Sequence, residues 1–125
     1  NLIVGGEITL IAEAFGLARR AGVDLTRLME ALSGGAAASP VLTMKGSKMI
    51  SGDYTASSRV LIHLKDQHNA QEMARALGAD IPACDLSTLL LEKLADMGRG
   101  NEDVAAVIDL FQSKVDLRRL WNGNL

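Results

Sequence analysis

The chain has 125 residues, which is about the size of one domain. Hydrophobic residues make up 48% and aromatic residues only 3%, and 13 Lys and Arg stand against 15 Asp and Glu, for a net charge of −2. A protein that follows nucleic-acid phosphates carries a basic excess, and one that stacks on bases needs more aromatic rings, so we expect no nucleic-acid partner. A disordered chain would hold fewer aliphatic residues. The composition therefore indicates one globular domain.

The cysteine content indicates the kind of cellular compartment in which the protein resides. Cys84 is the single cysteine, which excludes a disulfide framework and is typical of a reducing compartment. We interpret it as a small buried thiol and expect a cytoplasmic protein.

The first segment, residues 2–21, contains no proline and is apolar around most of a helical wheel. Such a helix must be covered on several sides. Glu7 and Glu13 interrupt it and Arg19 and Arg20 close it, so it is too short an apolar run to cross a membrane. The pattern predicts a long buried helix at the centre of the fold. Because the chain opens inside this helix and without Met, we expect it to be part of a longer protein.

Capping residues and glycines predict the remaining helices. Asp24 and Ser39 are favourable N-caps, and glycines follow the apolar stretches at the points where helices should end. The next four helices are expected at about 24–34, 39–51, 60–77 and 83–97, with a polar connector at 53–59. A sixth is expected from Asn101, with one apolar face made by Val104, Val107, Ile108, Phe111 and Val115. The prediction is an all-α domain of about six helices around the first one.

A Lys-Asp pair stands out in the helix at 60–77. On a helical wheel Asp66 lies between Met73 and Leu77, within an apolar stripe, and Lys65 lies at its polar edge. A buried carboxylate needs a partner. The residues alone leave two interpretations open: Asp66 caps a neighbouring helix and Lys65 is merely solvated, or the pair belongs to a functional site.

Other combinations predict no metal site and no phosphate loop. His63 and His68 are five residues apart, hence about 140° apart on a helix, and they cannot share a metal. Gly34-Gly35 lies between two helices and does not fit the spacing of a phosphate-binding turn, so we interpret it as a helix end.

Several short motifs, in this order, resemble one family. They are Asn1–Val4, Glu13–Asp24, Leu32–Ser39, Leu64-Lys65-Asp66 and Ala76–Pro82. Together they resemble the C-terminal helical domain of the β-hydroxyacid dehydrogenases, a family of 3-hydroxyisobutyrate dehydrogenase and tartronate semialdehyde reductase type that is also 6-phosphogluconate dehydrogenase-like. The resemblance covers residues 1–115 and leaves 116–125 as an unassigned tail. Ser39 and Gly35 match a loop near the family's active cleft, but their capping roles explain them sufficiently.

The resemblance implies an enzyme that transfers hydride between NAD or NADP and a small hydroxy acid or semialdehyde. The cofactor would be bound mainly by an N-terminal Rossmann domain upstream of this chain. The family's catalytic lysine would lie four residues before Asn1, and Asn1 would bind substrate. Lys65 would close over the cofactor, with Asp66 holding its helix. The chain by itself would then be inactive.

The first helix suggests an alternative. Its apolar surface needs cover, and this family often buries the equivalent helix between subunits, so the resemblance implies a homo-oligomer, either a dimer or a tetramer. The alternative hypothesis is a helical dimerisation or interaction module without catalytic duty. Lys65 separates the two, because only the enzyme requires it for cofactor use.

Overall fold

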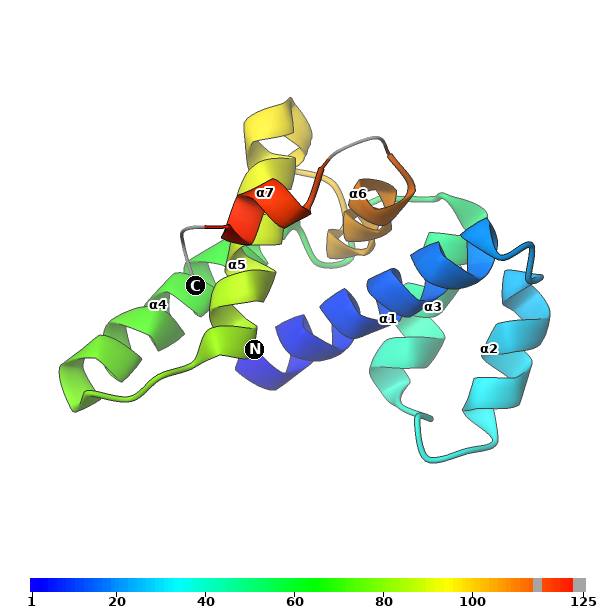
Figure 1. Ribbon diagram of the computed structural model, residues 1–125, viewed down its shortest axis with the longest axis horizontal. Helices are drawn as coiled ribbons and strands as arrows, with labels where there is room; N and C mark the ends of the chain where they lie inside the picture. Colours follow the sequence, from blue (N-terminus) through cyan, green and yellow to red (C-terminus); the bar gives the residue numbers. More distant parts are fainter. Residues whose placement is uncertain (114–115, 123–125) are drawn as a thin grey trace.

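The computed structural model describes residues 1–113 and 116–122, and it shows an all-α architecture. The α-helices within these ranges are α1 (Leu2–Arg20), α2 (Leu25–Ser33), α3 (Pro40–Ser51), α4 (Val60–Leu77), α5 (Pro82–Leu94), α6 (Ile108–Gln112) and α7 (Arg118–Trp121). In Figure 1, α1 runs through the middle, with α2 and α3 on one side and α4 and α5 on the other. The described residues hold no strand, only an isolated antiparallel bridge between Arg59 and Asp103. The predicted fold class is confirmed.

Helix caps lie where the sequence predicts them. The Asp24 carboxylate accepts a hydrogen bond of 3.0 Å from the Arg27 N–H, and the Ser39 hydroxyl accepts one of 3.0 Å from the Leu42 N–H. These bonds satisfy backbone donors that have no partner within the first turn of α2 and α3. Gly78 ends α4 with a φ of 65°, in the left-handed region that favours glycine.

The predicted start of the sixth helix at Asn101 is wrong. Asp103 is the capping residue, and its carboxylate accepts a bond of 3.0 Å from the Ala105 N–H. A 3₁₀ turn at Val104–Val107 follows and leads into α6. The Val104 N–H donates to the Ser58 carbonyl oxygen at 2.9 Å, so with the Asp103 cap the first two N–H groups of the turn have partners. Val115, which we placed on the apolar face, lies outside the described residues.

The two C-terminal segments also differ in detail from the prediction. The fifth helix does not stay regular up to Met97, since a π-helical turn at Ala95–Arg99 follows α5 and contains Gly98 in the left-handed region, with a φ of 79°. In the unassigned tail, Leu117 packs against the core, and α7 follows it. Figure 1 shows α7 lying across α5.

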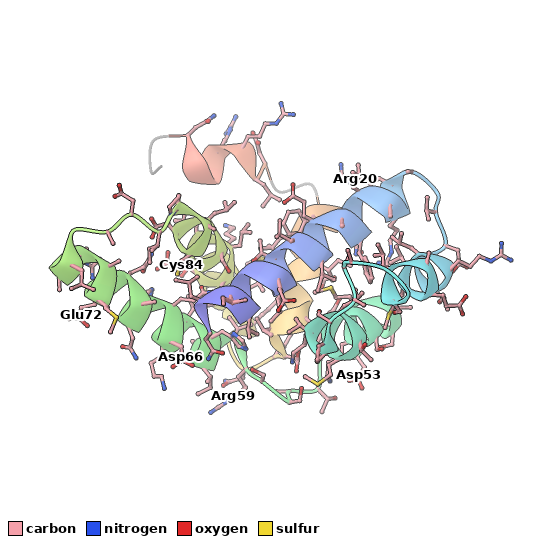
Figure 2. The ribbon with its side chains drawn as sticks, turned by 90° about the horizontal axis from the view of Figure 1, so that it is seen from below. Arg20, Asp53, Arg59, Asp66, Glu72 and Cys84 are labelled. Atoms are coloured by element: carbon pink, nitrogen blue, oxygen red, sulfur yellow. The ribbon has the colours of Figure 1, made fainter. Side chains whose placement is uncertain are left out.

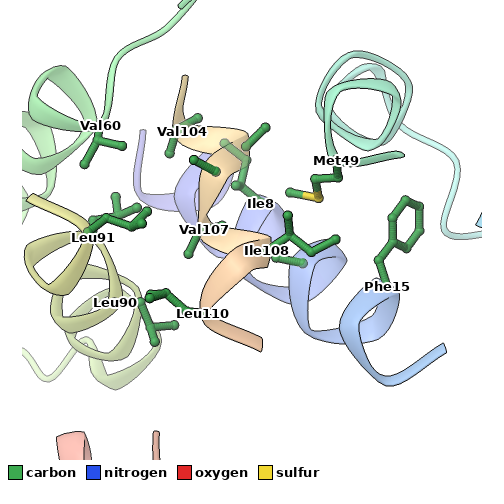
Figure 3. Close-up of a cluster of buried hydrophobic side chains, with 14 of the residues drawn as sticks. Ile8, Phe15, Met49, Val60, Leu90, Leu91, Val104, Val107, Ile108 and Leu110 are labelled. Atoms are coloured by element: carbon green, nitrogen blue, oxygen red, sulfur yellow. The ribbon is translucent and has the colours of Figure 1, made fainter. Parts of the chain in front are cut away.

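The core forms where α1 crosses the other helices (Figure 3). Ile8, Ala12 and Phe15 of α1 are buried and meet side chains from α3, α5, the 3₁₀ turn and α6. Those partners include Met49, Leu90, Leu91, Val104, Val107, Ile108 and Leu110. Gly16 lets α6 approach α1 closely, because a Cβ there would lie 2.6 Å from Phe111 Cβ. The first helix is therefore central, as predicted.

The burial of α1 is less complete than predicted. Ile3, Leu10 and Leu17 are 75%, 66% and 71% exposed. Seven residues are close to two helical turns, so these three side chains lie on one face of α1. The described part of the chain leaves that face uncovered.

The apolar stripe predicted for α4, made of Ile62, Ala70, Met73, Ala74 and Leu77, is confirmed only at Ala74, which is buried. Ile62, Met73 and Leu77 are exposed. The rest of the buried face carries Val60, His63, Leu64 and Gln67. Gln67 can be fully buried because hydrogen bonds to Ser87 at 2.9 Å and to Thr88 at 3.1 Å satisfy its side-chain amide. The two helices α4 and α5 therefore meet through a polar network. None of the described helices is long and apolar enough to cross a membrane.

Candidate functional site

Three of the residues singled out in the sequence meet at the N-terminal end of α1. The side-chain amide of Asn1 donates a hydrogen bond to the carboxylate of Asp66, 65 positions along the chain. The same carboxylate lies 3.1 Å from the ammonium nitrogen of Lys65. Figure 2 shows Asp66 on α4 beside the first turn of α1. The fold therefore brings both predicted ligand-binding residues, Asn1 and Lys65, to a shared carboxylate.

Asp66 contacts both Asn1 and Lys65 through an ionised carboxylate. Hydrogen bonds from Lys65 and then from Asn1 lower the pKa of Asp66, so it is an ionised acceptor at neutral pH. Asp66 is paired, as its polar nature requires, and its partner at α1 is a side-chain amide. One N–H of the Asn1 amide is used here, which leaves its second N–H and its carbonyl oxygen for a ligand. The Lys65 side chain is 64% exposed and free to reach a bound molecule.

A cleft of about 510 Å³ opens beside Asn1. The first turn of α1 contributes Asn1 and Val4. The other walls come from α3, the connector before α4, and α4 itself, through Met44, Lys45, Lys48, Ser57, Ser58 and His63. The sequence analysis did not identify these wall residues as a group.

A buried ion pair builds the inner wall of the cleft. Lys45 Nζ lies 2.9 and 3.1 Å from the two carboxylate oxygens of Asp103, and the two side chains are 5% and 0% exposed. The Ser57 hydroxyl donates to the same carboxylate at 2.8 Å. Burial by itself raises the pKa of Asp103, but the hydrogen bonds from the Ala105 N–H, Lys45 and Ser57 lower it to about 2. The wall is thus a charged, fully bonded network that ties α3 to the turn before α6.

Sequence reasoning missed Lys45, although a signal was present. Lys45 follows Leu42 by three residues and precedes Met49 by four, so it shares the buried face of its helix with two core residues. A lysine in phase with an apolar face requires a buried partner. Asp103 supplies it from 58 positions away, which no local pattern reveals.

His63, on the buried face of α4, lines the same cleft as Lys45. It is 3% exposed, its Nε2 lies 2.6 Å from the Ser58 hydroxyl, and its Nδ1 is buried without a hydrogen-bond partner in the structure. Burial, and then the charge of Lys45, lower the pKa of His63, so the ring is neutral at neutral pH. His68, by contrast, faces outward and pairs with Glu92 at 3.0 Å.

Metal and dinucleotide binding place different demands on these residues. Within residues 1–113 and 116–122, no three His, Cys, Asp or Glu side chains gather around a point that could hold a metal ion. Cys84 is a buried free thiol, as interpreted from the sequence, and burial raises its pKa. Ser39 and Gly35 do not line the cleft. Lys65 offers an exposed ammonium group beside Asp66, outside the residues that line the cleft.

Comparison with known proteins supports a family assignment. Residues 1–111 match the family described as NAD-binding of NADP-dependent 3-hydroxyisobutyrate dehydrogenase. The 2-hydroxy-3-oxopropionate reductase of Escherichia coli K12 is 30% identical over 112 residues, which are 90% of this chain and 38% of that protein. The L-threonate dehydrogenase of the same strain is 32% identical over 111 residues, 89% of this chain and 37% of that protein.

Comparison of the fold with solved structures identifies the same group of proteins. A crystal structure of 3-hydroxyisobutyrate dehydrogenase from Salmonella typhimurium superposes with a TM-score of 0.84 at 31% sequence identity. The match covers 87% of this chain and 38% of that one, so the chain spans less than two fifths of the length of these relatives. On sequence and on fold, the chain belongs to the NAD-binding family of NADP-dependent 3-hydroxyisobutyrate dehydrogenase.

Proposed function

We propose that this chain is the helical, substrate-side part of an NAD- or NADP-dependent dehydrogenase that acts on a small hydroxy acid or the corresponding semialdehyde. The observation that carries the proposal is the convergence of Asn1, Lys65 and Asp66, because Asn1 lines the cleft and its amide bonds to the carboxylate that also pairs with Lys65. The family match and the dehydrogenase and reductase names of the relatives support the reaction class.

Each of these three residues has a chemical role in this proposal. Asn1 uses its free amide hydrogen and carbonyl oxygen to orient the substrate hydroxyl. Lys65 donates from its exposed ammonium to the cofactor, and Asp66 positions both. A lysine four residues before Asn1 would lie one turn away on the same helix face and exchange the proton of that hydroxyl. When bound, NAD or NADP supplies the hydride acceptor.

The described residues fit only part of such a cofactor. Lys65 provides one cationic contact, and no glycine-rich turn between a strand and a helix occurs within the described chain. The dinucleotide would therefore be bound mainly by a Rossmann domain, with this chain closing the cleft over it. The free thiol Cys84 is in keeping with a cytoplasmic enzyme.

Reconstitution tests the proposal. The 125-residue chain alone should show no measurable NAD(P)H oxidation with tartronate semialdehyde or methylmalonate semialdehyde. A protein that joins this chain to its dinucleotide-binding domain should turn over at least one of these substrates. Turnover by the isolated chain at the rate of an intact enzyme would contradict the proposal that a separate domain binds the dinucleotide. A joined protein that is folded but inactive would contradict the proposed activity.

The uncovered face of α1 favours an additional role in oligomerisation. Ile3, Leu10 and Leu17 form an exposed apolar row on the helix that carries Asn1. We propose that a second copy of the chain covers this row in a dimer or tetramer. The alternative function, an interaction module without catalytic duty, rests on the same row and requires nothing of Lys65.

A further inference from the structure

A buried polar junction, made of Gly5, Thr9, Gln67 and Ser87, joins α1, α4 and α5 one helical turn after Asn1. The Ser87 hydroxyl, on α5, donates to the Gly5 carbonyl oxygen at 3.2 Å. The same hydroxyl oxygen accepts a hydrogen bond of 2.9 Å from the Gln67 amide of α4 and another of 2.9 Å from the Thr9 hydroxyl of α1. Because a serine hydroxyl has one hydrogen and two lone pairs, Ser87 uses its full hydrogen-bonding capacity to connect the three helices.

The junction requires a glycine at position 5. A Cβ on Gly5 would lie 2.1 Å from Gln67 Nε2, so a side chain there would displace the Gln67 amide. A Cβ on the next residue, Gly6, would meet nothing within 4 Å. The close approach of α4 to the first turns of α1 therefore depends on Gly5 and not on its neighbour.

The junction lies next to the contact between Asn1 and Asp66 on both helices. On α1, the Gly5 N–H donates to the Asn1 carbonyl oxygen at 2.8 Å, so these two residues are one turn apart on the same face. On α4, Gln67 directly follows Asp66. The contact between Asn1 and Asp66 is exposed, and water competes for such a bond.

The junction, by contrast, is sealed from water. Gln67 is 0% exposed and Ser87 is 1% exposed. A buried polar network whose members all have partners holds its elements in one arrangement. The junction is therefore the contact that fixes the first turn of α1 relative to α4.

We propose that Ser87 and Gln67 are positioning residues for the dehydrogenase reaction, and that they hold Asn1 against Asp66 in the geometry that orients the substrate hydroxyl. The inference rests on the proposed function and deepens it, because it names the residues on which the aim of Asn1 depends. Neither Ser87 nor Gln67 lines the cleft, so both act through α1 and not by contact with a ligand.

Kinetics of the protein joined to its dinucleotide-binding domain test this role. Gly5→Ala displaces the Gln67 amide and should lower kcat/KM for the hydroxy acid about tenfold, because small misplacements of an orienting group slow a reaction strongly. The KM for NAD(P) should not change. Gly6→Ala is the matched control, the same substitution one residue further on, and it should leave these constants unchanged.

Gln67→Met is a second variant that removes the amide without leaving a hydroxyl unpaired. Ser87 still donates to the Gly5 carbonyl oxygen, and Thr9 still donates to Ser87. The Thr88 hydroxyl still has the Cys84 carbonyl oxygen as its acceptor, at 2.8 Å. The variant should therefore fold, and it should lower kcat/KM for the hydroxy acid by about the same factor as Gly5→Ala.

A double-mutant cycle with Asn1→Ala separates positioning from a loss of folded protein. If Gln67 acts through Asn1, Gln67→Met should change kcat/KM less than twofold when Asn1 is already alanine. A tenfold loss in both backgrounds would show that Gln67 supports only the fold, and it would overturn the inference. An unchanged kcat/KM in both Gln67→Met and Gly5→Ala would overturn it as well.

NMR of the 125-residue chain tests the inference without turnover. A nuclear Overhauser effect between the Asn1 side-chain amide and the Asp66 β hydrogens should be present in the wild type and in Gly6→Ala. It should be absent in Gln67→Met, in a spectrum that otherwise remains that of the folded chain. If the joined protein is inactive, the proposed function fails but this measurement still decides: loss of the effect in Gln67→Met supports the junction, and its persistence overturns the inference.

Discussion

Lys45 is a lysine that the fold keeps almost entirely out of water. Its partner Asp103 accepts hydrogen bonds from the ammonium, from Ser57 and from the Ala105 N–H, so a single carboxylate joins α3, the connector and the turn before α6. Buried ion pairs contribute little net stability compared with apolar residues, but removal of one member leaves an uncompensated charge. The pair therefore acts mainly to fix the wall of the cleft.

Replacement of this lysine should destabilise the chain strongly. Lys45→Met leaves the Asp103 carboxylate buried without its cation, and we expect a loss of about 3–5 kcal/mol in the free energy of unfolding measured with urea. Lys65→Met is the control, since Lys65 is 64% exposed and its ion pair is worth at most about 1 kcal/mol. Similar losses in the two variants would argue against a buried, paired Lys45.

The same carboxylate should confer a dependence on acid. Because the pKa of Asp103 is about 2 in the folded chain and near 4 when unfolded, the unfolded state binds more protons between these values. The contribution of Asp103 is complete above pH 4 and is lost as the pH falls towards 2. Urea unfolding between pH 4 and pH 2 should show a smaller loss of stability for Asp103→Asn than for the wild type; equal losses would refute this assignment.

Local patterns revealed some residues of the site and hid others. Asp24 and Ser39 act as caps through bonds to residues three positions away, which a short sequence window contains. Asn1 and Lys65 were predicted only through the family resemblance. Their meeting at Asp66 and the pairing of Lys45 with Asp103 join positions 65 and 58 residues apart, and only the folded chain shows such contacts.

At the scale of elements, glycines on α1 distinguish its packed and open surfaces. A Cβ on Gly16 would lie 2.6 Å from Phe111 Cβ, an atom that cannot move without its backbone, whereas a Cβ on Gly6 would meet nothing within 4 Å. Gly16 therefore permits the close approach of α6, whereas Gly6 has no contact that requires a glycine.

Two alanine substitutions should therefore have opposite effects. Gly6→Ala should stabilise the chain by about 1 kcal/mol, the difference in helix propensity between the two residues. Gly16→Ala should destabilise it by about 1–3 kcal/mol through overpacking against α6. Thermal unfolding of both variants measures this, and a stabilising Gly16→Ala would show that α6 does not pack closely on α1.

The helices themselves were largely predictable, but their buried faces were not. Apolar periodicity and caps located α1 to α5 to within a few residues. The buried face of α4 was mistaken because Gln67 is buried through bonds to Ser87 and Thr88, while Met73 and Leu77 are exposed. A wheel that counts only apolar residues cannot anticipate a buried polar network.

At the scale of the whole molecule, the exposed row on α1 should control self-association. Leu10→Glu places a charge in the middle of the row formed by Ile3, Leu10 and Leu17, and it should convert the oligomer to a monomer. Sedimentation velocity of the wild type and the variant measures this. Glu13→Gln, an exposed change on the same helix, is the control. A wild type that is monomeric at all concentrations would contradict the proposed oligomer.

The most direct test of the account is the contribution of Lys65 to cofactor use. In the protein joined to its dinucleotide-binding domain, Lys65→Ala removes the exposed ammonium beside Asp66 and should raise the KM for NAD(P) about tenfold or more. Arg75→Ala, at the other end of α4, is the matched control and should leave it unchanged. An unchanged KM for NAD(P) and an unchanged kcat in Lys65→Ala would contradict the cofactor role and favour an interaction module.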